Sequence, residues 1–286
     1  LQKQFTYELP VASAQVKSSI LLAALASGTS VEIIEPIQTR DHTERMIKNF
    51  GANLEITPKG SKNIIQLAPS NQLTAKNYTV VGDISSAAFL IVAALISQSP
   101  GLEIINVGIN PSRTGVLLAL QKMGADIEIR NQRIESGEPC ADLKIKKSIL
   151  RGVELSGDII PNIIDEIPII SIAAAFAEGE TIIRDAAELR VKESDRLKAI
   201  SDGFTRLGVA HKNFKDGMSI MGSSNPLLID QPISIESHED HRIAMSFLIA
   251  GLKCSKPIIV KDCKNIFTSF PNFIELISSI GYKLEK

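Results

Sequence analysis

The most chemically suggestive stretch of the sequence is AELRVKESDRL, which covers residues 187–197. It carries five charged side chains within seven positions: Arg190, Lys192, Glu193, Asp195 and Arg196. Residues three and four apart share one face of a helix, so a helix here would bring Lys192, Glu193 and Arg196 together. Positioned carboxylates can transfer protons, and a guanidinium can bind two oxygens of an anion in parallel. The same composition also fits an ordinary solvated helix face.

Other polar side chains stand where apolar helices are expected to begin. These positions are Ser13 with Gln15, Asp83 with Ser85 and Ser86, Asp165 with Glu166, and Asp240 with His241 and Arg242. A helix N-terminus has free N–H donors and about half a positive charge, which together favour an anion. Serine and aspartate are also common N-caps, each worth about 1 kcal/mol. The residues alone therefore allow either an anion site or simple capping.

The helices that must position these residues recur in a fixed alternation. An Ala-rich apolar helix followed by a β-branched strand starts near residues 13, 82, 165 and 240. Each is followed by a more amphipathic helix that closes at a glycine, and these are Gly51, Gly124, Gly208 and Gly281. Glycine suits the residue after a helix because that residue often takes a left-handed conformation. The sequence thus predicts four copies of one α/β unit.

The burial expected of the Ala-rich helices predicts the architecture. Because they are apolar nearly all round, they should be buried on several sides, inside a shell of sheets and amphipathic helices. The polar stretch 76–83 predicts a domain boundary, with one unit in residues 1–80 and three units in residues 81–286. Pro168 fits the first turn of a helix, which would place Asp165 near the cap position.

Composition narrows the classes of function. Thirty-one basic and 32 acidic residues give a net charge of -1, which disfavours bulk binding to nucleic acid. The longest apolar stretches are near 11 residues, as in 87–97, too short for the roughly 20 residues that a membrane span needs. Three scattered cysteines predict reduced thiols and a cytoplasmic protein. The first residue is not Met, which suggests a chain that starts inside a longer protein.

Eight motifs, in order along the chain, closely resemble the 5-enolpyruvylshikimate-3-phosphate synthases. They are PVASAQVKS (10–18), TRDHTERM (39–46), GDISSAAF (82–89), GINPSRTG (108–115), IDEIPI (164–169), RVKESDR (190–196), DHRIAM (240–245) and TSFPNF (268–273). The resemblance implies an α/β fold of two domains, each built from three βαβαββ units in an inside-out barrel. Four of those six units would be present here, and the SAQ form at 13–15 resembles the class II branch.

The resemblance implies transfer of the enolpyruvyl group of phosphoenolpyruvate to the 5-hydroxyl of shikimate 3-phosphate. Asp165 would bind and deprotonate the hydroxyl, and Glu193 would handle protons at the methylene carbon. The residues implied to bind the substrates are Ser13, Ala14, Gln15, Arg40, Asp165, Lys192, Arg196 and Arg242. The arginines could instead form structural ion pairs. Arg40 could pair with Asp41 or Glu44, and Arg196 and Arg242 could pair with Asp195 or Asp240.

Further expectations follow from the same resemblance. The family needs no cofactor and no metal, and the H-x-x-H at His238 and His241 lacks the supporting ligands of a zinc site. The complete protein would be a monomer in the cytoplasm with no nucleic-acid or membrane partner. Two alternatives remain: an incomplete, inactive substrate-binding fragment, and the related UDP-N-acetylglucosamine enolpyruvyl transferase. Lys17, four residues after Ser13, fits a solvated flank as well as a site residue.

Overall fold

The computed structural model describes residues 5–60, 62–69, 73–97 and 100–284, and its chain forms two compact units. Unit 1 comprises Leu1–Val81, Gly108–Ser112 and Gln132–Cys140, and unit 2 comprises Gly82–Val107, Arg113–Asn131 and Ala141–Lys286. Two short segments of unit 1 thus come from the part of the chain that the sequence assigned to the second domain. Identifying the units with a first and a second domain stays a prediction.

Unit 1 is a four-stranded sheet with two helices. Its elements are β1 (Phe5–Glu8), α1 (Ala14–Ser27), β2 (Val31–Glu35), α2 (His42–Asn49), β3 (Leu54–Lys59) and β4 (Lys62–Leu67). The strand order is β1-β2-β4-β3, with β1 parallel to β2 and the other two pairs antiparallel. Alternation along β2 buries Val31 and Ile33 in a core that also takes Leu21 from α1 and Ile47 from α2.

Helix α1 departs from the burial expected of an Ala-rich helix. Only Lys17, Leu21 and Ala24 are buried along it, and Leu22 is 46% exposed. The prediction of burial on several sides is wrong for this helix, because among the described residues it packs on one side only, against the sheet of unit 1. Its predicted beginning is confirmed, since the Ser13 hydroxyl accepts a hydrogen bond from the Val16 N–H.

Unit 2 holds the remaining strands and helices. Its strands are β5 (Leu102–Gly108), β6 (Asp126–Glu135), β7 (Glu138–Lys146), β8 (Glu154–Leu155), β9 (Gly179–Ile183), β10 (His211–Phe214), β11 (Gly217–Gly222), β12 (Ile233–Glu236) and β13 (Ile258–Lys261). Its α-helices are α3 (Ile84–Ile96), α4 (Gly115–Lys122), α5 (Ile160–Ile163), α6 (Ile167–Ala175), α7 (Arg196–Leu207), α8 (His241–Gly251), α9 (Ile266–Ser269) and α10 (Phe273–Ser279). Short 3₁₀ turns are η1 (Gly157–Ile159), η2 (Ala187–Val191) and η3 (Cys263–Asn265). Strands β6 and β7 extend into the segment grouped with unit 1.

The sheets confirm the predicted repeat for the first three copies, whereas the last copy has a two-stranded sheet and no strand in the described residues 282–284 that follow Gly281. The order β8-β9-β11-β10 reproduces β1-β2-β4-β3, with the first pair parallel and joined through an Ala-rich helix. The sheet β5-β7-β6 lacks a full strand equivalent to β1. In its place, Gly82 forms a single parallel bridge with Val107 of β5. The last copy pairs β12 in parallel with β13 across α8. The four predicted closing glycines have φ values of 94°, 94°, 71° and 92°, all in the left-handed region.

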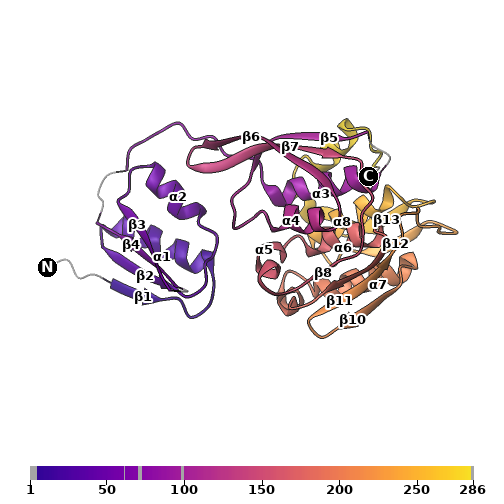
Figure 1. The fold of residues 1–286 in the computed structure, drawn as a ribbon, viewed down its shortest axis with the longest axis horizontal. Coiled ribbons are helices and arrows are strands. Elements are labelled where there is room, and N and C mark those ends of the chain that lie inside the picture. The colour runs from indigo at the N-terminus through magenta and orange to yellow at the C-terminus, as the bar shows by residue number, and fades with distance from the viewer. Residues whose placement is uncertain (1–4, 61, 70–72, 98–99, 285–286) are drawn as a thin grey trace. The chain divides into compact units, whose positions relative to one another are not determined.

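The core of unit 2 consists of helices with the sheets outside them. All nine residues of α6 are buried, as are twelve of the thirteen in α3 and most of α8. Figure 1 shows these three helices inside the unit, with β5 and β7 on one side and β8 to β11 on another. The prediction of buried Ala-rich helices is therefore confirmed for unit 2. No helix within the described ranges is both long and apolar enough to cross a membrane.

A close helix contact yields a test of this packing. A Cβ built on Gly203 of α7 would lie 2.0 Å from the Phe247 ring of α8. We expect Gly203→Ala to lower the free energy of unfolding by about 1–3 kcal/mol, the usual cost of overpacking, although alanine is the better helix former by about 1 kcal/mol. Urea titration measures this, and the loss should shrink in a Phe247→Leu background. Equal losses in the two backgrounds would contradict the contact.

Candidate functional site

Arg196, the first residue of α7, is 0% exposed and contacts three carboxylates. Its Nε donates to Asp240 Oδ2 at 2.8 Å, and its Nη2 donates to Glu193 Oε2 at 2.5 Å. Its Nη1 lies 3.6 Å from Asp165 Oδ1 but, within the described residues, donates no hydrogen bond. An unpaired buried donor is costly, so Nη1 is suited to a ligand oxygen.

Asp165 lies between three cations in the turn that precedes α6. Its carboxylate oxygens are 3.7 Å from Lys192 Nζ, 3.6 Å from Arg196 Nη1 and 4.0 Å from Arg242 Nη2. Arg242 Nη1 also donates to the backbone carbonyl of Asp165 at 2.9 Å. Pro168 does occupy the first turn of α6, and Asp165 lies near the cap position as predicted, directly before the N-cap residue Glu166.

The segment before α7 differs from the helix that the sequence predicted. The prediction that Lys192 and Glu193 share a helix face with Arg196 is wrong, because α7 begins only at Arg196 and the preceding residues are bends. Asp195 is the N-cap and accepts from the Lys198 N–H, which ends the irregular segment there. The three side chains still meet, since Glu193 pairs with Arg196 and Lys192 approaches Asp165.

Asp240 supports both arginines from the N-cap of α8. Burial alone would raise the pKa of Asp240, but hydrogen bonds from Arg196, the Arg242 N–H and Ser194 hold that pKa below its usual range. Next to it, burial and the charge of Arg242 lower the pKa of His241. Arg196 therefore has Asp240 as an ion-pair partner, whereas Asp195 pairs with Arg190 at 3.0 Å.

The predicted substrate residues of unit 1 lie around the beginning of α1 and before α2. Ser13 is the N-cap of α1, Ala14 is its first residue, and the exposed Gln15 carbonyl lies 3.4 Å from the Ser13 hydroxyl. Arg40 is half-buried in the loop between β2 and α2. The structure does not place these residues relative to those of unit 2, so their role as one site remains a prediction.

Sequence reasoning missed a buried cluster in unit 1. Lys17 is 1% exposed, and its Nζ lies 2.7 Å from Glu35 Oε1 and 2.6 Å from Glu44 Oε1. Glu35 Oε1 also accepts from the Thr39 N–H at 3.0 Å and from the Thr39 hydroxyl at 2.6 Å. The cluster thus joins α1 to the loop that carries Arg40. The solvated-flank interpretation of Lys17 is wrong, because its charge is buried.

Sequence reasoning also gave no individual role to Glu166, Ser85 and Arg113, which lie beside the predicted site residues. Glu166 and Ser85 stood among the helix-start residues that could bind an anion or cap a helix, and Arg113 lay inside GINPSRTG without a role. Glu166 is buried and Arg242 Nη1 lies 3.4 Å from its Oε1, which adds a carboxylate behind the predicted site. Nothing in the local sequence separates a capping acid from one that pairs between helices, so contacts across the fold were needed to find it.

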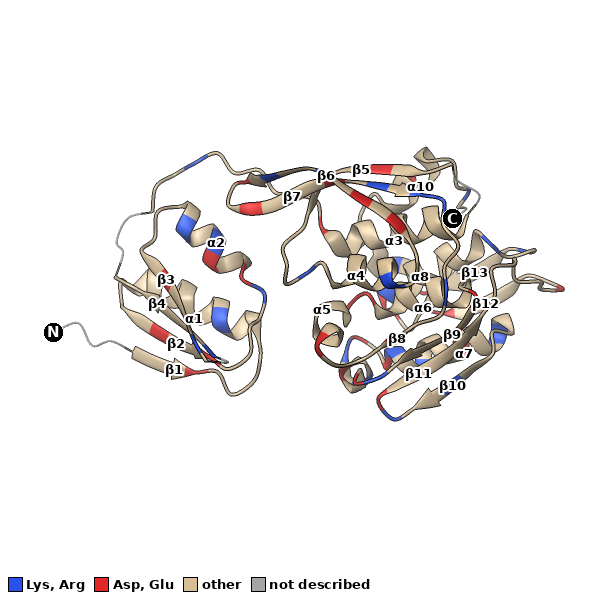
Figure 2. Cartoon of the chain, viewed as in Figure 1, with Lys and Arg blue, Asp and Glu red and all other residues tan. Residues whose placement is uncertain are grey.

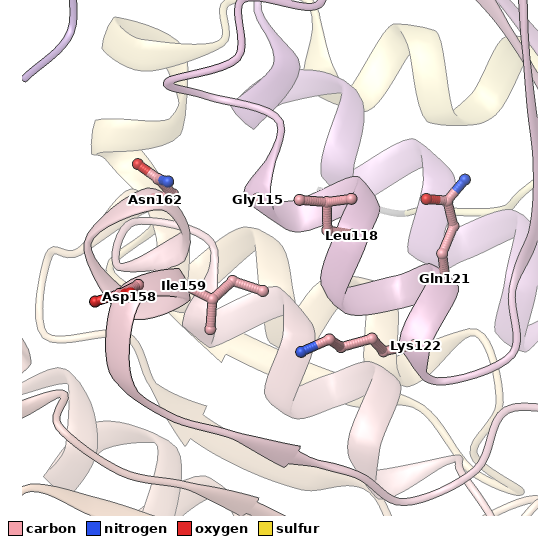
Figure 3. Close-up of a pocket in the computed structure, with 7 residues that line it drawn as sticks. All are labelled: Gly115, Leu118, Gln121, Lys122, Asp158, Ile159 and Asn162. Atoms are coloured by element: carbon pink, nitrogen blue, oxygen red, sulfur yellow. The ribbon is translucent and has the colours of Figure 1, made fainter. Parts of the chain in front are cut away.

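Two hollows lie elsewhere. One, of about 540 Å³, is lined by Gly115, Leu118, Gln121, Lys122, Asp158, Ile159 and Asn162, which Figure 3 shows on α4 and around η1 and α5. Another, of about 450 Å³, is lined by Asp41, Glu44, Arg45, Lys48, Asn49, Ile56 and Gly137 of unit 1. None of the predicted site residues lines either hollow. Both charge signs are interspersed along each unit in Figure 2, so anion attraction must be local.

A metal site finds no support among the residues that the structure describes, which contain no group of three or more His, Cys, Asp or Glu suited to one. His238 has a left-handed backbone just before α8, and His241 is the first residue of that helix. The helix starts of α3, α7 and α8 have Asp caps, and the charged groups gather at the starts of α6, α7 and α8. This arrangement suits an anionic substrate.

The fold places the chain in a class of known proteins. The enolpyruvyl transferase NikO from Streptomyces tendae superposes with a TM-score of 0.75 at 16% identity, over 98% of this chain and 64% of that one. So low an identity shows the fold alone, which is the enolpyruvyl transferase fold. An EPSP synthase from Acinetobacter baumannii is similar at 46% identity and a TM-score of 0.91, over 99% of this chain and 64% of its own.

The family model described as EPSP synthase (3-phosphoshikimate 1-carboxyvinyltransferase) matches residues 2–277, so the chain belongs to this family. Relatives named 3-phosphoshikimate 1-carboxyvinyltransferase agree with it. The one from Citrifermentans bemidjiense is 46% identical over 97% of this chain, and the one from Petrotoga mobilis is 49% identical over 96%. The chain spans 63% and 62% of the length of these two relatives.

The Lys17 cluster predicts a pH effect on stability. Burial raises the pKa of Glu44 above its ordinary 4.5, despite the neighbouring Lys17. A raised pKa means that the folded state holds this proton more tightly, so the contribution of Glu44 to stability falls as pH rises above about 4.5. We expect Glu44→Gln to gain stability relative to the original chain between about pH 4.5 and pH 7. Urea titrations across this range measure the difference, and Glu55→Gln, an exposed control, should show no such trend.

Proposed function

We propose that the complete protein transfers the enolpyruvyl group of phosphoenolpyruvate to the 5-hydroxyl of shikimate 3-phosphate and releases phosphate. Membership of the family supports this. The observation that carries it is the convergence of Lys192, Arg196 and Arg242 on Asp165, with Glu193 bound to Arg196. Cations and carboxylates gathered at helix starts are what an anionic substrate and two proton transfers require.

Arg196 and Arg242 are proposed to bind the carboxylate and phosphate of phosphoenolpyruvate. Their guanidinium groups have a planar fork that matches two anion oxygens, and Arg196 Nη1 lacks a hydrogen-bond acceptor within the described part of the chain. Lys192, the third cation beside Asp165, would neutralise charge that develops during the transfer. Ser13, Ala14, Gln15 and Arg40 of unit 1 are proposed to hold shikimate 3-phosphate.

The two carboxylates would divide the proton transfers. Asp165 accepts the proton of the 5-hydroxyl while the hydroxyl oxygen forms a bond to the central carbon of phosphoenolpyruvate. Glu193 donates a proton to the methylene, which becomes the methyl group of a tetrahedral intermediate. Phosphate then leaves with the proton that Asp165 had taken up, and removal of a methyl proton by Glu193 gives the enolpyruvyl ether and restores both carboxyl groups. The reaction needs no cofactor or metal, and we propose that the protein works as a monomer in the cytoplasm.

Replacing either arginine with lysine should test the anion site. In the complete protein, Arg196→Lys and Arg242→Lys should each raise the KM for phosphoenolpyruvate by about 10- to 100-fold, because an ammonium cannot make two parallel hydrogen bonds. Steady-state phosphate release measures this, with Arg190→Lys as a control that lies outside the anion site. Unchanged KM values for the first two variants would remove both arginines from the proposed site.

Proton exchange should separate the two carboxylates. In deuterated water, turnover should exchange methylene hydrogens of phosphoenolpyruvate, because the methyl group can return any of its hydrogens. Glu193→Gln should suppress turnover and exchange by at least about 10²-fold, whereas Asp165→Asn should leave shikimate 3-phosphate affinity within about tenfold. Mass spectrometry follows the exchange. Near-normal exchange in Glu193→Gln would assign this proton to another residue.

Measurement of phosphate release also tests two alternative functions. We propose that the 286-residue chain by itself binds substrate without turnover, since it spans 62–64% of the relatives' length. Turnover at the rate of the complete protein would contradict that. UDP-N-acetylglucosamine offered in place of shikimate 3-phosphate should give no phosphate release, and release with it would favour the related transferase.

A further inference from the structure

Glu166 occupies the N-cap position of α6 but does not cap that helix. At the starts of α3, α7 and α8, the carboxylates of Asp83, Asp195 and Asp240 each accept a hydrogen bond from a backbone N–H of their own helix. The Glu166 side chain makes no such bond, although it is only 2% exposed. A buried carboxylate is costly unless it is paired, so its partners explain why it is there.

The partners of Glu166 come from two other helices. The Ser85 hydroxyl of α3 donates to Glu166 Oε1, and Arg242 Nη1 of α8 lies 3.4 Å from the same oxygen. Arg113 supports Ser85 in turn, since its Nη2 lies 2.5 Å from the Ser85 hydroxyl and 3.3 Å from Asp83 Oδ1. One carboxylate thus joins the beginnings of α3, α6 and α8.

Glu166 and the Asp165 backbone together hold one nitrogen of Arg242. Arg242 Nη1 is held by Glu166 Oε1 and by the Asp165 carbonyl oxygen at 2.9 Å. Its Nη2 makes a longer contact, 4.0 Å to Asp165 Oδ2, and donates no hydrogen bond within the part of the chain that the structure describes, so it can turn to a ligand anion. A planar guanidinium fixed at one nitrogen has little rotational freedom left, so its other donors are oriented before the ligand arrives.

We propose that Glu166, held by Ser85 and Arg113, is the positioning residue that orients Arg242 for phosphoenolpyruvate. This inference rests on the proposed function and adds to it residues of α3 and α6 that do not themselves touch substrate. A purely structural ion pair would affect stability and all kinetic constants together. A positioning residue acts selectively, on the affinity for the anion that Arg242 binds.

The first experiment compares two buried serines in the complete protein. Ser85→Ala removes the hydroxyl that donates to Glu166, whereas Ser171→Ala removes one that donates to the Ile167 carbonyl within α6. Ser85→Ala should raise the KM for phosphoenolpyruvate by about 3- to 10-fold, as expected for loss of one hydrogen bond, with the KM for shikimate 3-phosphate unchanged. Ser171→Ala should change neither KM. Equal effects of the two variants on the KM for phosphoenolpyruvate would overturn the proposal.

A double-mutant cycle tests Glu166 itself. Glu166→Gln keeps the size of the side chain but removes its charge, and it should raise the KM for phosphoenolpyruvate by at least about tenfold. In an Arg242→Lys background the same change should add less than about threefold, because coupled residues are not additive. Additive effects would show that Glu166 does not act through Arg242. Should Glu166→Gln fail to fold, the serine pair still decides.

The controls separate this inference from the function on which it rests. If the unmodified complete protein releases no phosphate from phosphoenolpyruvate and shikimate 3-phosphate, the proposed function fails and this inference fails with it. If it turns over while both the Ser85 and the Glu166 variants keep their KM for phosphoenolpyruvate, the inference alone fails. Thermal melting of every variant identifies any increase in KM that reflects global destabilisation.

Discussion

The burial of the Arg196 guanidinium is the constraint around which the site of unit 2 is built. A charge removed from water is tolerated only when hydrogen-bonded partners surround it, and breaking a buried pair costs about 3–5 kcal/mol. Here Glu193 before α7 and Asp240 at the start of α8 accept hydrogen bonds, and the Asp165 carboxylate before α6 is a charge partner at 3.6 Å. The beginnings of three helices must therefore meet around one side chain, and the sheets outside them have to permit it.

Small side chains make that meeting possible. Helix α6 is apolar apart from Ser171, with three consecutive alanines at its end, and all its residues are buried. Such helices can pack on all sides, and their N-terminal ends add about half a positive charge each to the same region. The Glu166 carboxylate does not cap α6. It instead contacts Ser85 of α3 and Arg242 of α8. The close packing of these apolar helices thus also brings the charged residues at their N-terminal ends together.

Local patterns predicted part of this arrangement. The caps at Ser13, Asp83 and Asp240 and the left-handed closing glycines depend on neighbouring residues only, and these were found from the sequence. The burial of Lys17 depends on Glu35 and Glu44, 18 and 27 residues away, so no local pattern distinguishes it from a solvated lysine. The irregular segment before α7 was misassigned for a similar reason. The spacing of Lys192, Glu193 and Arg196 fits a helix, but Asp195 is the N-cap, so the helix begins only after it.

The charge balance around Asp165 bears on how an anion enters such a site. The cluster contains three cations, Lys192, Arg196 and Arg242. Its four carboxylates are those of Asp165, Glu166, Glu193 and Asp240, so it carries no excess of positive charge. Glu193 differs from the other carboxylates because it lies on the irregular segment and its side chain is 52% exposed. An anion bound at Arg196 would repel the Glu193 carboxylate at a few ångströms, which favours outward rotation of that side chain. Under the proposed function, the exposed position of Glu193 on the bends before α7 would leave room for this rotation when phosphoenolpyruvate binds.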